Sequence, residues 1–360
     1  MSGSTFGKSF SITTFGESHG KGLGVVVDGC PSGLLLSEEL IQPYLDRRKP
    51  GQSGATTARA EADRVEILSG VFEGRTTGTP IAMLIRNTDQ HSGDYSNIKE
   101  LYRPGHADYC FDEKYGFRDY RGGGRSSGRE TIGRVAGGAV AALLLKEVGI
   151  EFTTYVKSIG DIEISTFDSK EILNNPMYMP DKEAAKRAYD YVMSLREESD
   201  SVGGIVECRI KGVPAGLGEP VFDKLDALLA HAIFSIGAVK GFEIGSGFSA
   251  ARKRGSENND PFEIRDGAVA KTTNNSGGIL GGISDGDEIV FRAAFKPTPS
   301  IARDQNTVNK DRQPAIINIK GRHDPVIPPR AVVVVECMAA IVIADLYKEN
   351  LGNRLDSFRR

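Results

Sequence analysis

The segment from Arg121 to Thr131 combines the residue types that bind small, highly charged anions. Its sequence, RGGGRSSGRET, holds arginines at four-residue spacing together with four glycines and two serines. Glycines let backbone N–H groups turn in one direction, and guanidinium groups match the geometry of carboxylates and phosphates. A helix predicted from 131 to 148 follows at once, so its N-terminus would add the positive end of a dipole. The segment therefore predicts an anion-binding loop rather than a flexible linker, which would favour Gly and Ser without the arginines.

Two histidines lie in turns near such cations. His19 lies between two glycines in the segment 15–20, and His106 follows a Pro-Gly pair in the segment 103–108. Histidine is the side chain best suited to proton transfer near neutral pH. A loop histidine is also commonly a hydrogen-bonding residue, so both roles stay open for His19. Asp108 is a possible orienter of His106.

Three further segments place cations beside turns. They are residues 47–52 after a predicted helix, 296–300 after a predicted strand, and 321–330, where His, Asp and two arginines lie within ten residues. The first fits either an anion site or favourable placement of cations at a helix C-terminus. The second fits either a phosphate site or a proline-rich strand end. Residues 275–284 hold four glycines that would admit a flat group, but without the spacing of a dinucleotide fingerprint or P-loop.

Composition excludes several classes of protein. The 360 residues are 39% hydrophobic and carry a net charge of −3, without the basic excess of a general nucleic-acid binder. The four cysteines form no C-x-x-C motif, no secretory leader is recognisable, and the longest apolar run, 135–145, is too short to span a bilayer. We therefore expect a cytoplasmic enzyme with no nucleic-acid or membrane partner. Its small substrate would carry phosphate and carboxylate groups, and histidines would act as acid–base groups.

The predicted elements alternate irregularly, which favours an α+β fold over a doubly wound parallel sheet. Strands are predicted at 24–28, 65–72, 80–86, 204–211, 288–295 and 331–335. Helices are predicted at 37–47, 131–148, 182–196, 220–236 and 337–347. The helix at 131–148 is apolar on nearly all sides and is expected to be buried. The charged motifs are scattered from residue 16 to 330, so we expect a single domain over 1–360 whose site is assembled from both halves.

Taken together, these motifs closely resemble the chorismate synthase family, over nearly the full chain. The segments that carry the resemblance are TTFGESHG (13–20), DRRKPGQS (46–53), SGVFEGRTTGTPI (69–81), RPGHADYCFDEKYGFRDYRGGGRSSGRET (103–131), AVKGFEIG (238–245), NNSGGILGGIS (274–284), FKPTPSI (295–301) and GRHDPVIPPRA (321–331). The continuous block from 103 to 131 is highly specific.

The resemblance implies the last step of the shikimate pathway. The substrate would be 5-enolpyruvylshikimate 3-phosphate, converted to chorismate and phosphate by an anti-1,4-elimination. The family needs reduced FMN although the reaction has no net redox change. The implied fold is a three-layer β-α-β sandwich with a central helical layer, and the implied assembly is a homotetramer.

Residue roles follow from the resemblance by position. His106 would hold a proton at the reduced flavin, His19 would protonate the departing phosphate, and Asp324 would help accept the proton taken from the substrate. The implied substrate-binding residues are Arg48, Ser127, Arg129 and Arg330. The implied flavin-site residues are Arg125, Ser126, Ser127, Ala238, Gly278, Lys296, Thr298, Ser300 and Arg322.

One position departs from the family pattern, which commonly has a second basic residue about six positions after Arg48. Gly54 stands there, with Ala55 beside it, so we expect weaker affinity for substrate or reductant unless Arg59 replaces the contact. Gly54→Arg should then lower the Michaelis constant. Longer fungal members carry an NADPH-dependent flavin reductase activity. At 360 residues the chain resembles the shorter bacterial type, which relies on an external flavin reductase or reductant.

Two other functions fit part of the pattern. A non-catalytic phospho-ligand or nucleotide-binding protein could use the same arginine loop, and His19→Ala and His106→Ala would then leave affinity intact. An RNA-binding protein could use the arginine cluster, but the net charge is −3 and only Tyr115, Phe117 and Tyr120 lie near it as stacking residues.

Overall fold

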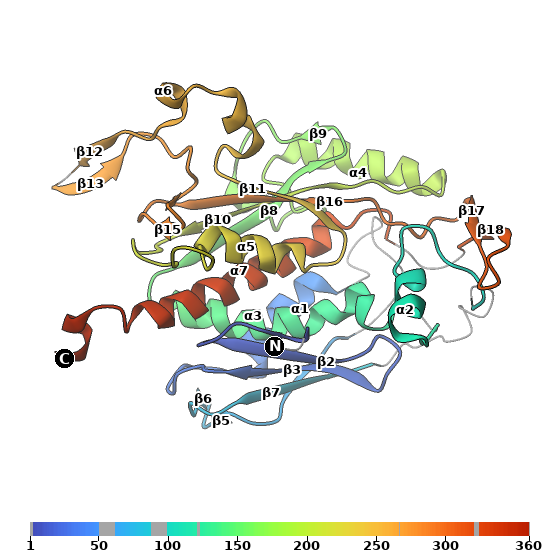
Figure 1. The fold of residues 1–360 in the computed structure, drawn as a ribbon, viewed down its shortest axis with the longest axis horizontal. Helices are drawn as coiled ribbons and strands as arrows, with labels where there is room; N and C mark the ends of the chain where they lie inside the picture. The colour runs from blue at the N-terminus through green and yellow to red at the C-terminus, as the bar shows by residue number, and fades with distance from the viewer. Residues whose placement is uncertain are drawn as a thin grey trace.

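Two antiparallel sheets enclose a layer of helices in the computed structural model (Figure 1). The structure describes residues 3–49, 62–87, 99–120, 123–265, 267–319 and 324–359. The first sheet has the strand order β1-β2-β3-β7-β4 and the second β11-β16-β10-β8-β9. The predicted α+β fold with a central helical layer is thereby confirmed.

The first sheet comes from the N-terminal part of the chain. Its strands are β1 (Thr5–Phe6), β2 (Ser11–Gly16), β3 (Gly22–Asp28), β4 (Val65–Ile67) and β7 (Ile81–Arg86). Burial alternates along β7, where Ile81, Met83 and Ile85 are fully buried and their neighbours are not. This period of two is that of a strand with one face against a core, and the buried face is the one that the helices cover.

The second sheet comes from the following half of the chain. Its strands are β8 (Glu151–Ile159), β9 (Ile162–Glu163), β10 (Gly204–Lys211), β11 (Val239–Ile244) and β16 (Ile289–Phe295). Along β16 the same alternation buries Ile289, Phe291, Ala293 and Phe295.

The central layer contains α1 (Glu38–Arg48), α3 (Thr131–Lys146), α5 (Leu225–Phe234) and α7 (Pro328–Asn350). Helix α3 packs on β2 and β3 as well as on α7, and α7 packs on β8 and β10. Both α3 and α7 begin at the end of the molecule drawn on the right in Figure 1 and run toward the left.

Glycines let α3 approach both of its neighbours closely. A Cβ atom at Gly137 would lie 2.8 Å from Cγ2 of Ile12 in the first sheet. At Gly138 it would lie 2.3 Å from Cβ and 2.6 Å from the carbonyl oxygen of Cys337 on α7. Such distances exclude a side chain, so these glycines set the spacing of the layers.

The remaining elements lie outside the two sheets and the central layer. The helices are α2 (Asp108–Tyr115), α4 (Lys182–Glu197), which packs beside β9, and α6 (Gly255–Asn258). The 3-10 helices are η2 (Gly124–Ser126), η3 (Gly128–Glu130), η4 (Ser169–Glu171), η5 (Gly247–Arg252) and η6 (Leu355–Arg359). Four two-stranded ribbons pair β5 (Val71–Phe72) with β6 (Arg75–Thr76), β12 (Phe262–Arg265) with β13 (Ala268–Lys271), β14 (Ile279–Leu280) with β15 (Ile283–Ser284), and β17 (Asp304–Val308) with β18 (Pro314–Asn318).

The strand predicted at 331–335 is wrong, because these residues form the first turns of α7. Pro328 and Pro329 occupy the first helical positions, where a missing N–H costs nothing. The valines at 332–335 are all buried, so this part of the helix has no polar face that would reveal a helical pattern in the sequence. A continuous apolar run of this kind does not separate a buried helix from a strand.

Two other predicted elements have different bounds. The helix predicted at 220–236 begins only at Leu225. The strand predicted at 65–72 is divided into β4 and β5, with a turn at Gly70, whose φ is +83°. Only glycine adopts that conformation readily.

Candidate active site

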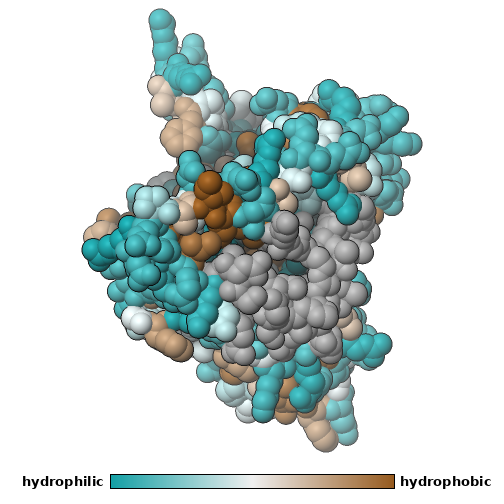
Figure 2. Space-filling model, turned by 90° about the vertical axis from the view of Figure 1, so that its right-hand side faces the viewer, coloured by the Kyte–Doolittle hydropathy of each residue, from teal (hydrophilic) through white to brown (hydrophobic). Residues whose placement is uncertain are grey.

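Three arginines that the sequence singled out converge where the central helices begin or end. Arg48 is the last residue of α1, Arg129 lies in η3 just before α3, and Arg330 lies in the first turn of α7. Figure 1 draws the starts of α3 and α7 at the right-hand end of the molecule, and Figure 2 shows that end, where most of the described surface is hydrophilic. Nε of Arg330 donates a hydrogen bond to the carbonyl of Arg48 at 3.1 Å, so two segments that are 282 residues apart in the sequence meet here.

Asp63 lies between two of these arginines. Its Oδ2 accepts a hydrogen bond from Arg48, and its Oδ1 lies 2.9 Å from a terminal nitrogen of Arg129. The three residues are 2%, 1% and 5% exposed, in the order Asp63, Arg48, Arg129. Burial opposes ionisation of Asp63, but the charges of Arg48 and Arg129 outweigh it and keep its pKa below the ordinary value. Burial lowers the pKa of Arg48 to about 10, against the opposing effect of Asp63.

Asp324 is ion-paired with Arg330 through one terminal guanidinium nitrogen. Both residues are partly exposed, in contrast to the fully buried Arg48. Among the described residues, this cluster holds the positive groups Arg48, Arg129 and Arg330 and the negative groups Asp63 and Asp324. The formal charges of these five side chains sum to +1, which suits an anionic ligand.

Asn87 ties the His19 loop to the arginines. Its Oδ1 accepts a hydrogen bond from Nε of Arg129 at 2.7 Å, and its Nδ2 donates to the carbonyls of Glu17 at 3.0 Å and Gly20 at 2.8 Å. Nδ1 of His19 lies 3.2 Å from the hydroxyl oxygen of Ser18. Asn87 thereby joins the backbone of the loop that carries His19 to Arg129.

A second group of the predicted residues surrounds His106. Its Nε2 lies 2.6 Å from the hydroxyl oxygen of Ser300, and Nζ of Lys296 donates to the carbonyl of Gly105 at 2.7 Å. The backbone N–H of Lys296 donates to the carbonyl of Ala238 at 2.9 Å, and Ala238 has the unusual φ of +72°. Burial and then the charge of Lys240 lower the pKa of Lys296. The structure thus brings His106, Lys296, Ser300 and Ala238 together.

Thr298 contributes a buried hydroxyl to the same segment. Its carbonyl accepts a hydrogen bond from Ser201 at 2.7 Å. Its Oγ1 is buried and has no hydrogen-bond partner among the residues that the structure describes. A buried hydroxyl of this kind is costly unless a ligand or water satisfies it.

The turn that carries His106 is fixed by ion pairs at Asp108. Arg103 donates to both oxygens of Asp108 at 2.7 Å, and Arg118 lies 3.2 Å from Oδ1. Burial opposes ionisation of Asp108, but the hydrogen bonds and charge of Arg103 lower its pKa overall. Asp108 was a possible orienter of the His106 side chain. Its two carboxylate oxygens instead bind Arg103 and Arg118 and hold the turn in place.

The arginine-rich loop forms two 3-10 turns ahead of α3. Arg125 reaches back to β2, where it donates to the hydroxyl of Thr14 at 2.6 Å and the carbonyl of Gly16 at 3.1 Å. Ser126 donates to the carbonyl of Gly123, and the hydroxyl of Ser127 accepts from the N–H of Arg129. These bonds explain the local fold: the serines close the turns and leave Arg129 pointed at Asp63.

Gly278 is not brought to this group. It precedes β14 and lies against Glu288 and Ile289 at the start of β16, whereas Lys296 follows the other end of that strand. The two ends of β16 are about 20 Å apart at the rise of an antiparallel strand.

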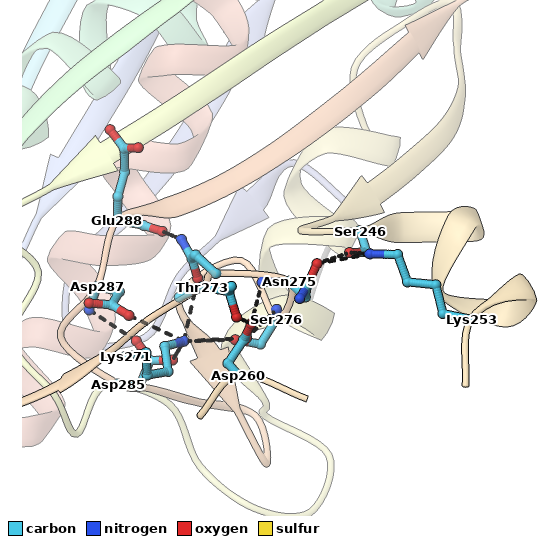
Figure 3. A network of polar contacts seen from close by, with 12 residues as sticks. Ser246, Lys253, Asp260, Lys271, Thr273, Asn275, Ser276, Asp285, Asp287 and Glu288 are labelled. Atoms are coloured by element: carbon cyan, nitrogen blue, oxygen red, sulfur yellow. Dashed lines mark hydrogen bonds and ion pairs between the residues drawn. The ribbon is translucent and has the colours of Figure 1, made fainter. Parts of the chain in front are cut away.

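Ion pairs at Lys271 shape the loop that contains Gly278. Nζ of Lys271 lies within ion-pair distance of Asp260, Asp285 and Asp287, and it donates to Ser276 at 2.8 Å (Figure 3). The N–H of Gly278 donates to Oδ1 of Asn274 at 2.8 Å.

Some predicted positions cannot be placed. Arg322, Gly54, Arg59 and Arg121 lie outside the described residues. Among the residues that are described, no group of three or more His, Cys, Asp or Glu side chains is arranged to hold a metal ion. None of the helices in the described ranges has the length and apolarity needed to cross a membrane.

Two residues of the cluster, Asp63 and Asn87, were not predicted from the sequence. Asn87 directly follows β7, where a polar side chain at a strand end is a usual position for a site residue. Asp63 lies two positions before β4 and carries no motif of its own. Its signal is a φ of +46°, which only the structure reveals.

The fold and this cluster define a three-layer β-α-β protein with a partly neutralised cationic site at the end where its central helices begin. Residues 10–347 match the family model described as chorismate synthase. Chorismate synthase of Lachnoclostridium phytofermentans is 64% identical over 363 residues, which cover 100% of this chain and 99% of that protein. Chorismate synthase of Methanosarcina mazei is 60% identical over 96% of each chain. A solved structure described as the crystal structure of chorismate synthase superposes with a TM-score of 0.77 at 34% identity, covering 96% of this chain and 94% of the other.

The chain belongs to the chorismate synthase family. It is therefore an enzyme of the lyase class and acts in the shikimate pathway, as the resemblance of its motifs implied.

Proposed function

We propose that the chain converts 5-enolpyruvylshikimate 3-phosphate to chorismate and phosphate by an anti-1,4-elimination. The observation that carries this proposal is the convergence of Arg48, Arg129 and Arg330 around only two described carboxylates. The substrate carries one phosphate and two carboxylate groups, and these anionic groups would pair with the three guanidinium groups. Guanidinium groups held in a buried setting interact with such anions more strongly than they would in water.

His19 would protonate the phosphate as it leaves. Because Asn87 bonds both Arg129 and the carbonyls that flank His19, an anion bound at Arg129 would have this imidazole close by. Proton donation to a leaving oxygen by a positioned histidine is a common form of general acid catalysis. Ser127, which caps the turn before Arg129, would contribute its hydroxyl to the same anion site.

Reduced FMN is proposed as the cofactor. The donors near Lys296 fit a phosphate-bearing group, because they combine an ammonium, the hydroxyl of Ser300 and the buried hydroxyl of Thr298, which has no partner in the described part of the chain. Arg125, Ser126, Ala238 and Arg322 would complete this site, and Gly278 would belong to a flavin site through a neighbouring copy. When bound, reduced FMN would supply electrons transiently to the substrate with no net redox change.

His106 would hold a proton beside the flavin, because Ser300 keeps its Nε2 oriented within the same group of residues. Asp324 would help accept the proton taken from the substrate. Its ion pair with Arg330 places this carboxylate at the edge of the proposed substrate site.

Several further properties belong to the proposal. The whole chain, 1–360, would act as one domain in the cytoplasm, with an external flavin reductase or reductant and no NADPH-dependent activity of its own. Gly278 lies far from Lys296 along β16 in one chain. In the proposed homotetramer, Gly278 would contribute to the flavin site of a neighbouring copy.

Substrate binding and turnover should be measured separately in His19→Ala and His106→Ala. An enzyme of the proposed kind would keep substrate binding within a few-fold in both variants but lose about 100-fold or more in kcat, as is typical of a general acid–base group. Unchanged kcat in both variants would refute the roles given to the histidines. Absence of substrate binding by the unmodified protein would refute the substrate.

A further inference from the structure

We propose that Asp63 is a positioning residue for the anion site: it fixes Arg48 and Arg129 for the phosphate or carboxylate groups of the substrate. This inference rests on the substrate proposed above. It does not place Asp63 in contact with the substrate. Asp63 acts through the two guanidinium groups that it joins.

The first support is the geometry of Asp63. One carboxylate oxygen faces Arg48 and the other lies 2.9 Å from Arg129, so a single side chain sets the relative position of both arginines. The three side chains are at most 5% exposed. Arginine carries much conformational freedom when it is unrestrained. Holding both groups in place before the ligand arrives removes this cost from binding.

The backbone of Asp63 supplies a second, independent support. Its φ of +46° lies in the left-handed region, which residues other than glycine rarely adopt. The carbonyl of Asp63 accepts a hydrogen bond from Nε2 of Gln42 on α1 at 3.2 Å. Strained conformations persist where the surroundings impose them, and they concentrate at functional sites.

Charge balance points the same way. Two buried guanidinium groups this close would repel each other without a carboxylate between them. One carboxylate shared by two arginines removes that repulsion and still leaves positive charge. Within the described part of the chain, Nε of Arg48 is buried without a hydrogen-bond partner, so this guanidinium retains binding capacity.

The neighbouring arginine on α1 shows the contrasting arrangement. Arg47 makes two hydrogen bonds, of 2.9 and 2.7 Å, to Glu336 on α7, so one carboxylate serves one arginine. Glu336 is 7% exposed and lies within the central layer. This pair joins two helices, and it offers a control for loss of a buried carboxylate outside the proposed site.

The test compares Asp63→Asn with Glu336→Gln, using inorganic phosphate as the probe. The dissociation constant is taken from the rise in melting temperature with phosphate concentration, so no turnover is needed. We expect phosphate to bind about tenfold or more weakly to Asp63→Asn, the effect of disturbing the charge-assisted hydrogen bond to Arg48 and the ion pair to Arg129. Glu336→Gln should melt at a lower temperature yet bind phosphate within twofold of the unmodified protein. Equal or tighter binding by Asp63→Asn would overturn the proposal, because Asp63 would then be a spectator or a competitor.

Steady-state kinetics give a second measurement, the balance between KM and kcat, which a purely structural role of Asp63 would not change. Asp63→Asn should raise KM for the substrate about tenfold or more with a smaller change in kcat, and its effect should shrink in an Arg129→Gln background because the two residues act together. Full additivity in that double-mutant cycle would overturn the proposal. If the unmodified protein makes no chorismate, the proposed function fails, but the phosphate measurement still tests Asp63.

Should Asp63→Asn not fold, Gln42→Met replaces it. This variant removes the hydrogen bonds of Gln42 to the carbonyl of Asp63, the N–H of Val65 and the carboxylate of Asp46, and it leaves the charges of the site unchanged. Weaker phosphate binding in a cooperatively folded Gln42→Met protein would support the proposal. Unchanged binding would overturn it.

Discussion

Oδ1 of Asn87 lies 2.7 Å from Nε of Arg129, so the first residue after strand β7 holds a site arginine in place. The amide nitrogen of the same side chain donates to two carbonyls of the loop that carries His19. One asparagine therefore sets the distance between a group that would bind the substrate and a group that would protonate it.

Asn87→Ala should uncouple these two groups. Three hydrogen bonds of about 1 kcal/mol each are lost, and we expect kcat/KM to fall about 10- to 100-fold. Steady-state kinetics under anaerobic conditions would measure this. Asn353→Ala is a matched control, because Asn353 is exposed and donates to Glu219 at the surface. A loss of equal size in both variants, or none in Asn87→Ala, would contradict this role.

The bond between His106 and Ser300 gives a second prediction. Ser300→Ala removes the hydroxyl that lies 2.6 Å from Nε2 of His106. We expect about a 3- to 10-fold loss in kcat and a comparable loss in flavin affinity, the range for one neutral hydrogen bond. Fluorescence titration with FMN and anaerobic kinetics would measure both. Ser249→Ala, at an exposed serine, should change neither; wild-type values for Ser300→Ala would show that the bond is dispensable.

Asp108 gives a prediction about pH. Its pKa is lowered in the folded protein, so its ion pairs stabilise the fold above the unfolded pKa of about 4 and are lost as pH falls through the folded value. Asp108→Asn should therefore lower the free energy of unfolding by about 3 kcal/mol at pH 7. That difference should shrink below about pH 4. Urea unfolding at several pH values would measure it, and a difference that persists unchanged at pH 3 would exclude this origin.

Gly138→Ala tests the packing of the central layer. The added methyl group would lie 2.3 Å from Cβ of Cys337, so α3 and α7 must move apart. We expect a loss of about 1–3 kcal/mol in the free energy of unfolding, typical of overpacking. Gly255→Ala is the control, since a Cβ there meets nothing within 4 Å. Equal stability of the two variants would show that the layer tolerates the shift.

Much of the fold was predictable from local pattern. Strands β7, β10 and β16 and the apolar helix at 131–148 were predicted within a few residues, because each has one buried face or is buried on nearly all sides. The start of α7 was not predicted. Its valines favour a strand, and because they are buried on all sides of the helix, the sequence shows no alternation of apolar and polar residues with a period of 3.6. Packing between the two sheets, and not local propensity, makes this segment helical.

The site was predictable in part for a similar reason. Glycine-rich and arginine-rich motifs are visible in sequence. The structure brings together Arg48, Arg129 and Arg330, which the family resemblance assigns to substrate binding. Asp63 and Asn87 escaped notice because their roles come from contacts with residues far away in the chain. A single aspartate or asparagine carries no spacing signal of its own.

The central claim is that these residues eliminate phosphate from 5-enolpyruvylshikimate 3-phosphate. The most direct measurement is anaerobic: purified protein with photoreduced FMN and this substrate, following chorismate absorbance and released phosphate together. The account predicts chorismate and phosphate in equal amounts, and neither product when reduced FMN is omitted. Phosphate release without chorismate, or no product although substrate and reduced FMN are both bound, would contradict it.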